Sequence, residues 1–124
     1  MNLGADAIWV SNNGGRIIDT APSTISVLPS ISKVVKEFNK KNNKNVEIYL
    51  DGGIRRGIDV MKALAFGARA VFVGRPAIYG LARSGKDGVK EVLEMLHEEF
   101  KLAMVLTHCM SIEEVTEEQV IHKI

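Results

Sequence analysis

Three short apolar runs, each followed by a glycine-containing polar loop, constrain the fold of this chain more than any other feature. The runs cover residues 7–10, 46–50 and 70–73, and amphipathic helical patterns separate them. Continuous apolarity of this length is typical of parallel strands that are covered on both faces. Strands that alternate with amphipathic helices predict an α/β fold, with a parallel sheet and right-handed crossovers.

The first two helices are predicted from apolar spacing and from residues that begin or end helices. The first is expected to begin around residues 23–26, because Pro29 is tolerated only near a helix start. It is expected to end in the asparagine-rich run 39–45. The second should begin near Ile58 and end at Gly67, a typical C-terminal cap.

The last part of the chain predicts further helices. A short apolar segment, residues 77–81, is followed by Gly85, which breaks it. Asp87 is then the predicted N-cap of the longest helix. Capping-box patterns at residues 111–114 and 116–119 predict a short terminal helix.

The composition limits the kinds of binding partner that can be expected for this chain. The 124 residues carry a formal net charge of +1, which gives no support for nucleic acid or an anionic membrane as a partner. The basic run 39–45 lacks interleaved aromatic residues and is interpreted as a solvated turn. No apolar run is long enough to span a membrane. The single cysteine, Cys109, is expected to be packed, and no metal-ligand spacing is visible.

The loop after the second run has the composition of an anion site. Residues 51–57 read Asp-Gly-Gly-Ile-Arg-Arg-Gly and lead directly into a helix. Backbone N–H groups, a helix start and the planar guanidinium of Arg55 can surround a phosphate. Gly74 and Arg75 repeat the pattern after the third run. Asp51 either accepts a hydrogen bond from a ligand hydroxyl, orients Arg55 or caps the next turn.

The loop after the first run is ambiguous by composition. Strand alternation places Ser11 and Asn13 on one side of the chain, and Arg16 could bind a carboxylate. Ser-Asn-Asn-Gly-Gly also suits an ordinary turn. Polar residues at the carboxyl ends of all three strands are typical of a (β/α)8 barrel, although a doubly wound sheet also fits and three strands cannot close a barrel.

These motifs together resemble the carboxyl-terminal third of the FMN-dependent 2-hydroxy acid oxidases and dehydrogenases, the glycolate oxidase family. The resemblance rests on residues 10–16, 50–65 and 71–76 and covers nearly the whole chain. It implies that residues 1–124 are one partial domain, the last three βα units of an FMN-binding (β/α)8 TIM barrel that is incomplete on its own. The Gly-Ala-Asp start, which suits the end of a preceding helix, also suggests part of something larger.

The resemblance also implies roles. Ser11 would contact the flavin, and Arg16 would hold the carboxylate of a short 2-hydroxy acid such as glycolate. The residues that would enclose the FMN ribityl chain and phosphate are Asp51, Gly52, Gly53, Ile54, Arg55, Gly74 and Arg75. Asn13 stands where the family has its catalytic histidine, and an amide is no base near neutral pH.

The resemblance further implies that catalytic groups lie on strands outside this sequence, namely a lysine, a carboxylate and tyrosines. We therefore expect the chain to be inactive alone, and to associate with itself or with a chain that supplies the missing strands. A non-catalytic phosphate- or flavin-binding module and a self-assembling half-barrel are the alternatives. An intracellular location, cytoplasmic or peroxisomal, is expected, although residues 121–124 are not the Ser-Lys-Leu address.

Overall fold

A computed structural model describes residues 4–120 of the chain. It contains the predicted three-stranded parallel sheet, in the order β1-β2-β3. The strands are β1 (Ala7–Val10), β2 (Glu47–Leu50) and β3 (Ala70–Val71). The third strand is shorter than predicted, because only Ala70 and Val71 pair with β2. Residues 1–3 and 121–124 lie outside the described residues. They include part of the start that suggested a preceding helix, and the whole ending that was compared with the peroxisomal address.

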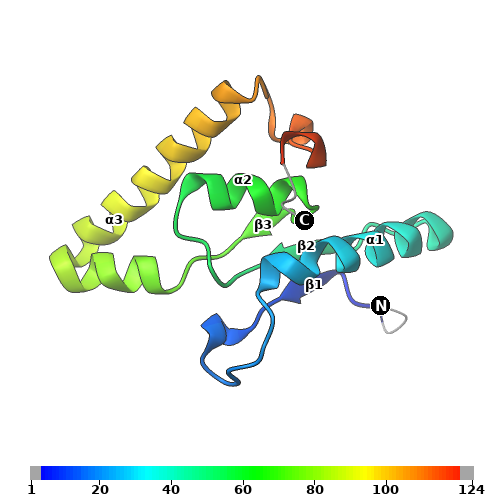
Figure 1. The fold of residues 1–124 in the computed structure, drawn as a ribbon, viewed down its shortest axis with the longest axis horizontal. Coiled ribbons are helices and arrows are strands. Elements are labelled where there is room, and N and C mark those ends of the chain that lie inside the picture. The colour runs from blue at the N-terminus through cyan, green and yellow to red at the C-terminus, as the bar shows by residue number, and fades with distance from the viewer. Residues whose placement is uncertain (1–3, 121–124) are drawn as a thin grey trace.

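Two helices cover one face of the sheet (Figure 1). They are α1 (Thr24–Asn42), which begins within the predicted window, and α2 (Gly57–Ala65). Pro29 lies in the second turn of α1. The main core lies between these helices and the sheet, and its fully buried side chains include Leu28 of α1 and Leu50 of β2.

The first half of the asparagine-rich run is helical, although a turn was predicted for the whole run. Helix α1 continues through Asn42 and ends at Asn43, whose φ of 50° is left-handed. The Asn39 side chain accepts a hydrogen bond from the Val46 N–H at 2.9 Å and donates one to the Val46 carbonyl at 3.0 Å. This pair of bonds connects the end of α1 to the start of β2, which composition alone could not predict.

The longest helix, α3 (Arg75–Leu106), is bent at the predicted break. Ser84 and Gly85 have non-helical dihedral angles, and Gly85 has a φ of 56°. Two arms therefore meet at an angle (Figure 1), and the backbones of Gly80 and Gly88 touch across the bend. Asp87 was predicted as an N-cap, which is wrong: it lies inside the helical range after the bend.

The chain after α3 forms two 3-10 turns in place of the predicted short helix. They are η2 (Ile112–Glu114) and η3 (Glu117–Gln119). The Thr116 N–H donates to Gln119 Oε1 at 2.7 Å, as a capping box requires, but no full helix follows. A second cluster of buried residues joins this segment to α2 and α3, and it contains Cys109, which confirms that the cysteine is packed.

The sheet face opposite α1 and α2 carries aromatic side chains. Trp9 and Phe72 stack with ring centroids 4.2 Å apart, and Tyr49 meets Phe72 edge-on at 5.9 Å. Trp9 is 54% exposed and Phe72 is 41% exposed. Within the described residues, no element covers this face, and the outer sides of β1 and β3 have no neighbouring strand.

No helix in the described part of the chain has the length and apolarity needed to cross a membrane.

Candidate functional site

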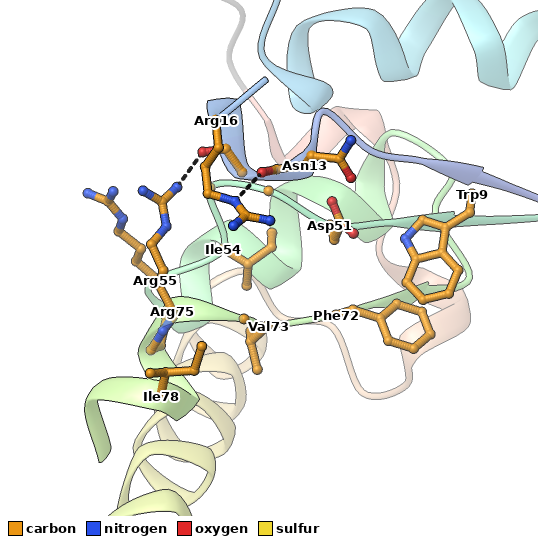
Figure 2. Close-up of a pocket in the computed structure, with 15 residues that line it drawn as sticks. Trp9, Asn13, Arg16, Asp51, Ile54, Arg55, Phe72, Val73, Arg75 and Ile78 are labelled. Atoms are coloured by element: carbon orange, nitrogen blue, oxygen red, sulfur yellow. Dashed lines mark hydrogen bonds between the residues drawn. The ribbon is translucent and has the colours of Figure 1, made fainter. Parts of the chain in front are cut away.

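An open cleft of about 460 Å³ lies at the carboxyl ends of the three strands. Nearly all the site residues predicted from the sequence line it, together with apolar side chains such as Trp9 and Phe72 (Figure 2). The predicted residues that line it are Asn13, Arg16, Asp51, Gly52, Gly53, Ile54, Arg55, Gly74 and Arg75. The carboxyl ends of neighbouring parallel strands meet at one edge of a sheet, and this explains why loops far apart in sequence converge.

Ser11 is the exception, because it does not line the cleft. Its Oγ accepts a hydrogen bond from the Asn13 N–H at 3.2 Å, within the short 3-10 turn region that follows β1. The predicted flavin contact of Ser11 therefore stays a prediction. Asn13 has a φ of 53°, a left-handed conformation that asparagine tolerates better than most residues.

Three arginines gather at one end of the cleft, while Trp9 and Phe72 lie at the other (Figure 2). Arg75 Nη2 donates to the Gly14 carbonyl at 2.7 Å, and Arg16 Nε donates to the Asn13 carbonyl at 3.0 Å. The Arg55 guanidinium has no hydrogen-bond partner among residues 4–120. With Asp51 as the single acidic residue of the lining, the cleft is locally positive in a chain of nearly neutral net charge.

The Asp-Gly-Gly loop presents unused polar groups. Gly52 and Gly53 have φ of 84° and 86°, and an added Cβ at Gly52 would lie 2.7 Å from Asn12 Oδ1. Their N–H groups have no acceptor within residues 4–120. Asp51 Oδ1 is buried and has no hydrogen-bond partner in the same range. A buried acceptor without a donor is costly, which indicates that a ligand hydroxyl or water satisfies it.

Residues outside the predicted motifs hold this loop in place. Thr24 Oγ1 lies 2.6 Å from the Asp51 carbonyl oxygen and 3.0 Å from that of Gly52. Asp59 Oδ2 accepts hydrogen bonds at 3.0 Å from the N–H groups of both Arg55 and Arg56. Neither contact was predicted. Asp59 is three residues after Arg56, as in a capping box, and this spacing is a sequence signal that could have predicted the Asp59 contact. The Thr24 contact joins residues 27 positions apart, and no local sequence pattern indicates it.

Helix α3 contacts the same loop through Glu99. Its carboxylate accepts two hydrogen bonds from Arg56 Nε, at 2.8 and 2.9 Å, and one from the Gly57 N–H at 2.8 Å. The Arg56 guanidinium and then the Gly57 N–H lower the pKa of Glu99, because both stabilise the ionised carboxylate. The same pairing raises the pKa of Arg56.

Within residues 4–120, no group of three His, Cys, Asp or Glu side chains is arranged to hold a metal ion. The donors at the cleft are instead guanidinium and N–H groups, which suit an anion. Fold and site together define an α/β protein with a cleft at the carboxyl ends of parallel strands, lined by groups that suit an anion.

Comparison with known proteins identifies the family. Residues 1–122 match the FMN-dependent dehydrogenase family. The chain is 56% identical to a 2-hydroxyacid oxidase of Dictyostelium discoideum over 115 residues, 93% of this chain and 28% of the relative. It is 50% identical to a peroxisomal (S)-2-hydroxyacid oxidase of Arabidopsis thaliana over 120 residues, 97% of this chain and 31% of the relative.

Solved structures agree with this result. A mandelate oxidase variant with a monooxide FMN adduct superimposes with a TM-score of 0.82 and 45% identity, over 92% of this chain and 34% of that one. The chain therefore belongs to the FMN-dependent dehydrogenase family, and its fold is part of the family's TIM barrel. It spans about 30% of the length of the curated relatives that it matches.

Proposed function

We propose that this chain forms the FMN-binding part of a 2-hydroxy acid oxidase, which converts a short 2-hydroxy acid such as glycolate to the 2-oxo acid. One observation carries the proposal: Arg55, Arg75 and the unpaired N–H groups of Gly52 and Gly53 converge on one cleft. These are the donors that a phosphate monoester requires. Family membership identifies FMN as the phosphate-bearing cofactor.

The roles divide along the cleft. Arg55, Arg75 and the glycine N–H groups hold the phosphate, and Asp51 Oδ1 accepts a hydrogen bond from a ribityl hydroxyl. Ile54 and Gly74 enclose the same ligand, and Ser11 contacts the flavin. Arg16, whose Nε bonds the Asn13 carbonyl, pairs with the substrate carboxylate. FMN, when bound, supplies the electron acceptor for the oxidation.

Asn13 makes the isolated chain inactive in this proposal. Oxidation of a 2-hydroxy acid requires that a base take the hydroxyl proton as the hydrogen on the adjacent carbon leaves with its electron pair. A carboxamide does not accept a proton near neutral pH. Loss of a general base typically lowers the rate by at least about two powers of ten. This favours the second candidate function, a non-catalytic phosphate- or flavin-binding module.

The proposed partners follow from the incomplete barrel. Three strands leave the aromatic sheet face and both sheet edges uncovered within the described residues. A self-assembling half-barrel would cover them, but copies with three strands each cannot add up to eight strands. We therefore propose that a chain or segment of the same family supplies the remaining strands, and that in its absence the uncovered surfaces associate with another copy of this chain. We propose an intracellular site of action, either cytoplasmic or peroxisomal.

A single titration tests the proposal. Purified chain is mixed with FMN, binding is followed by flavin fluorescence, and glycolate or lactate is then added without oxygen. We expect FMN to bind and its absorbance to remain unbleached. Failure to bind FMN would contradict the proposed function, and bleaching at rates ordinary for an oxidase would contradict the role given to Asn13.

The variant Asn13→His separates the two causes of inactivity. If it bleaches FMN at least about 100-fold faster than the unaltered chain, the missing base is the cause. If neither chain bleaches FMN, the strands that this chain lacks are required as well.

A further inference from the structure

One side chain outside the cleft contacts the backbone of the Asp-Gly-Gly loop. Thr24, the first residue of α1, is 2% exposed, and its hydroxyl lies between the carbonyl oxygens of Asp51 and Gly52 at 2.6 and 3.0 Å. Thr24 does not line the cleft, whereas Asp51, Gly52 and Gly53 do. The hydroxyl therefore contacts the loop from the side opposite the cleft.

The geometry of the peptide bond transmits this contact. In a trans peptide unit the C=O and N–H groups point in opposite directions, and the described chain has no cis peptide bonds. A hydroxyl that holds the carbonyls of Asp51 and Gly52 on the α1 side therefore directs the N–H groups of Gly52 and Gly53 to the other side. Those two N–H groups are the ones without acceptors in residues 4–120.

Without this restraint the loop could turn either way. Both glycines have positive φ, and glycine has the widest choice of backbone conformations. If either peptide unit flipped, it would present its carbonyl oxygen to the anion in place of its N–H group. The partial negative charge of the carbonyl oxygen would repel the anion. The loop is closely enclosed, because a Cβ at Gly52 would lie 2.7 Å from Asn12 Oδ1 and 3.4 Å from Thr24 Oγ1.

We propose that Thr24 is a positioning residue for the anion site, which orients the Gly52 and Gly53 N–H groups toward the ligand phosphate. This inference rests on the proposed FMN-binding function. It adds a residue that touches no ligand and acts only through the two peptide units.

The test compares two ligands that differ by one phosphate. Affinities for FMN and for riboflavin are measured by fluorescence titration for the unaltered chain, Thr24→Val and Thr24→Ser. Valine keeps the size and loses the hydroxyl, while serine keeps the hydroxyl. We expect Thr24→Val to bind FMN about tenfold more weakly, a loss equivalent to one hydrogen bond to a charged group. Riboflavin affinity should be unchanged, and Thr24→Ser should restore FMN affinity.

The outcomes distinguish this inference from the function on which it rests. If the unaltered chain does not prefer FMN to riboflavin, the phosphate site itself is refuted. If it does, and Thr24→Val retains the preference or loses affinity for both ligands equally, the positioning role is wrong. Circular dichroism checks folding. If Thr24→Val does not fold, Thr24→Cys replaces it, and as a weak donor it should bind FMN less tightly than Thr24→Ser.

Discussion

At the scale of single residues, the arginines of the cleft are expected to differ in what they do. Arg75 is already bonded to the Gly14 carbonyl, so it connects the first and third loops as well as facing the cleft. The side chain of Arg55 has no partner among residues 4–120 and is free to pair with a ligand. Removal of Arg55 should therefore change ligand binding with little effect on the fold.

We expect Arg55→Gln to weaken FMN binding by about 10- to 100-fold, because a charge-assisted hydrogen bond contributes about 1.5–3 kcal/mol. Flavin fluorescence titration measures the dissociation constant. The matched control is Arg83→Gln, an exposed arginine of α3 that does not line the cleft. Equal effects of the two substitutions would show that only general positive charge matters.

At the scale of elements, α2 begins in close contact with α3 because Gly57 has no side chain. A Cβ added there would overlap the backbone of Glu99 and Phe100. We expect Gly57→Ala to lower the free energy of unfolding by about 1–3 kcal/mol, the usual cost of overpacking, as measured by urea denaturation. Gly74→Ala is the control, since nothing lies within 4 Å of an added Cβ. A neutral Gly57→Ala would contradict the close packing.

The contact of Glu99 with α2 should depend on pH. Its pKa is lowered in the folded chain by Arg56 and by the Gly57 N–H, so the ionised carboxylate stabilises the fold. This stabilisation is present above the ordinary glutamate pKa and is lost as the pH falls through the lowered value. Melting temperatures of the unaltered chain and Glu99→Gln should therefore differ at about pH 6 and converge toward about pH 3.

Glu91→Gln, an exposed glutamate of the same helix, serves as the control for this pH series. Its melting temperature should follow that of the unaltered chain at every pH. A difference between Glu99→Gln and the unaltered chain that grows as the pH falls would contradict the sign of the effect.

At the scale of the whole molecule, the exposed apolar side chains include two groups that bear on association. One is the aromatic sheet face, with Trp9 and Phe72. The other is the end of α3 and the segment after it, where Leu106 is 70% exposed and Met110 is 88% exposed. Contiguous apolar surface of this kind usually marks an interaction site.

We expect sedimentation at micromolar concentration to show species heavier than the 13.6 kDa monomer. Trp9 is the single tryptophan, so its emission reports specifically on the aromatic sheet face. On dilution the emission should shift to longer wavelength as that face becomes solvated. A monodisperse monomer with exposed Trp9 at every concentration would refute self-association.

Local patterns were sufficient to predict the order of the strands and of the α-helices between and after them, up to the end of α3. Apolar runs identified the strands, and Gly85 marked the bend in α3, because these depend on side-chain periodicity and on the backbone freedom of glycine. The N-cap role of Asp87 and the terminal helix were wrong, since capping patterns indicate where a helix can begin but not whether packing favours one. Asn39 shows the same limit, because its amide meets Val46 only in the folded chain.

The sequence by itself determined the chemistry available at the strand ends: two glycine-arginine loops, an aspartate after the second strand, and an asparagine at the position that we propose for the base. The tertiary structure alone decided how these groups are held. Parallel pairing brings the three loops to one cleft, and α1 and α3 contribute Thr24 and Glu99 from 27 and 43 residues away. Such contacts have no local signature, because they depend on packing and not on the residues beside them.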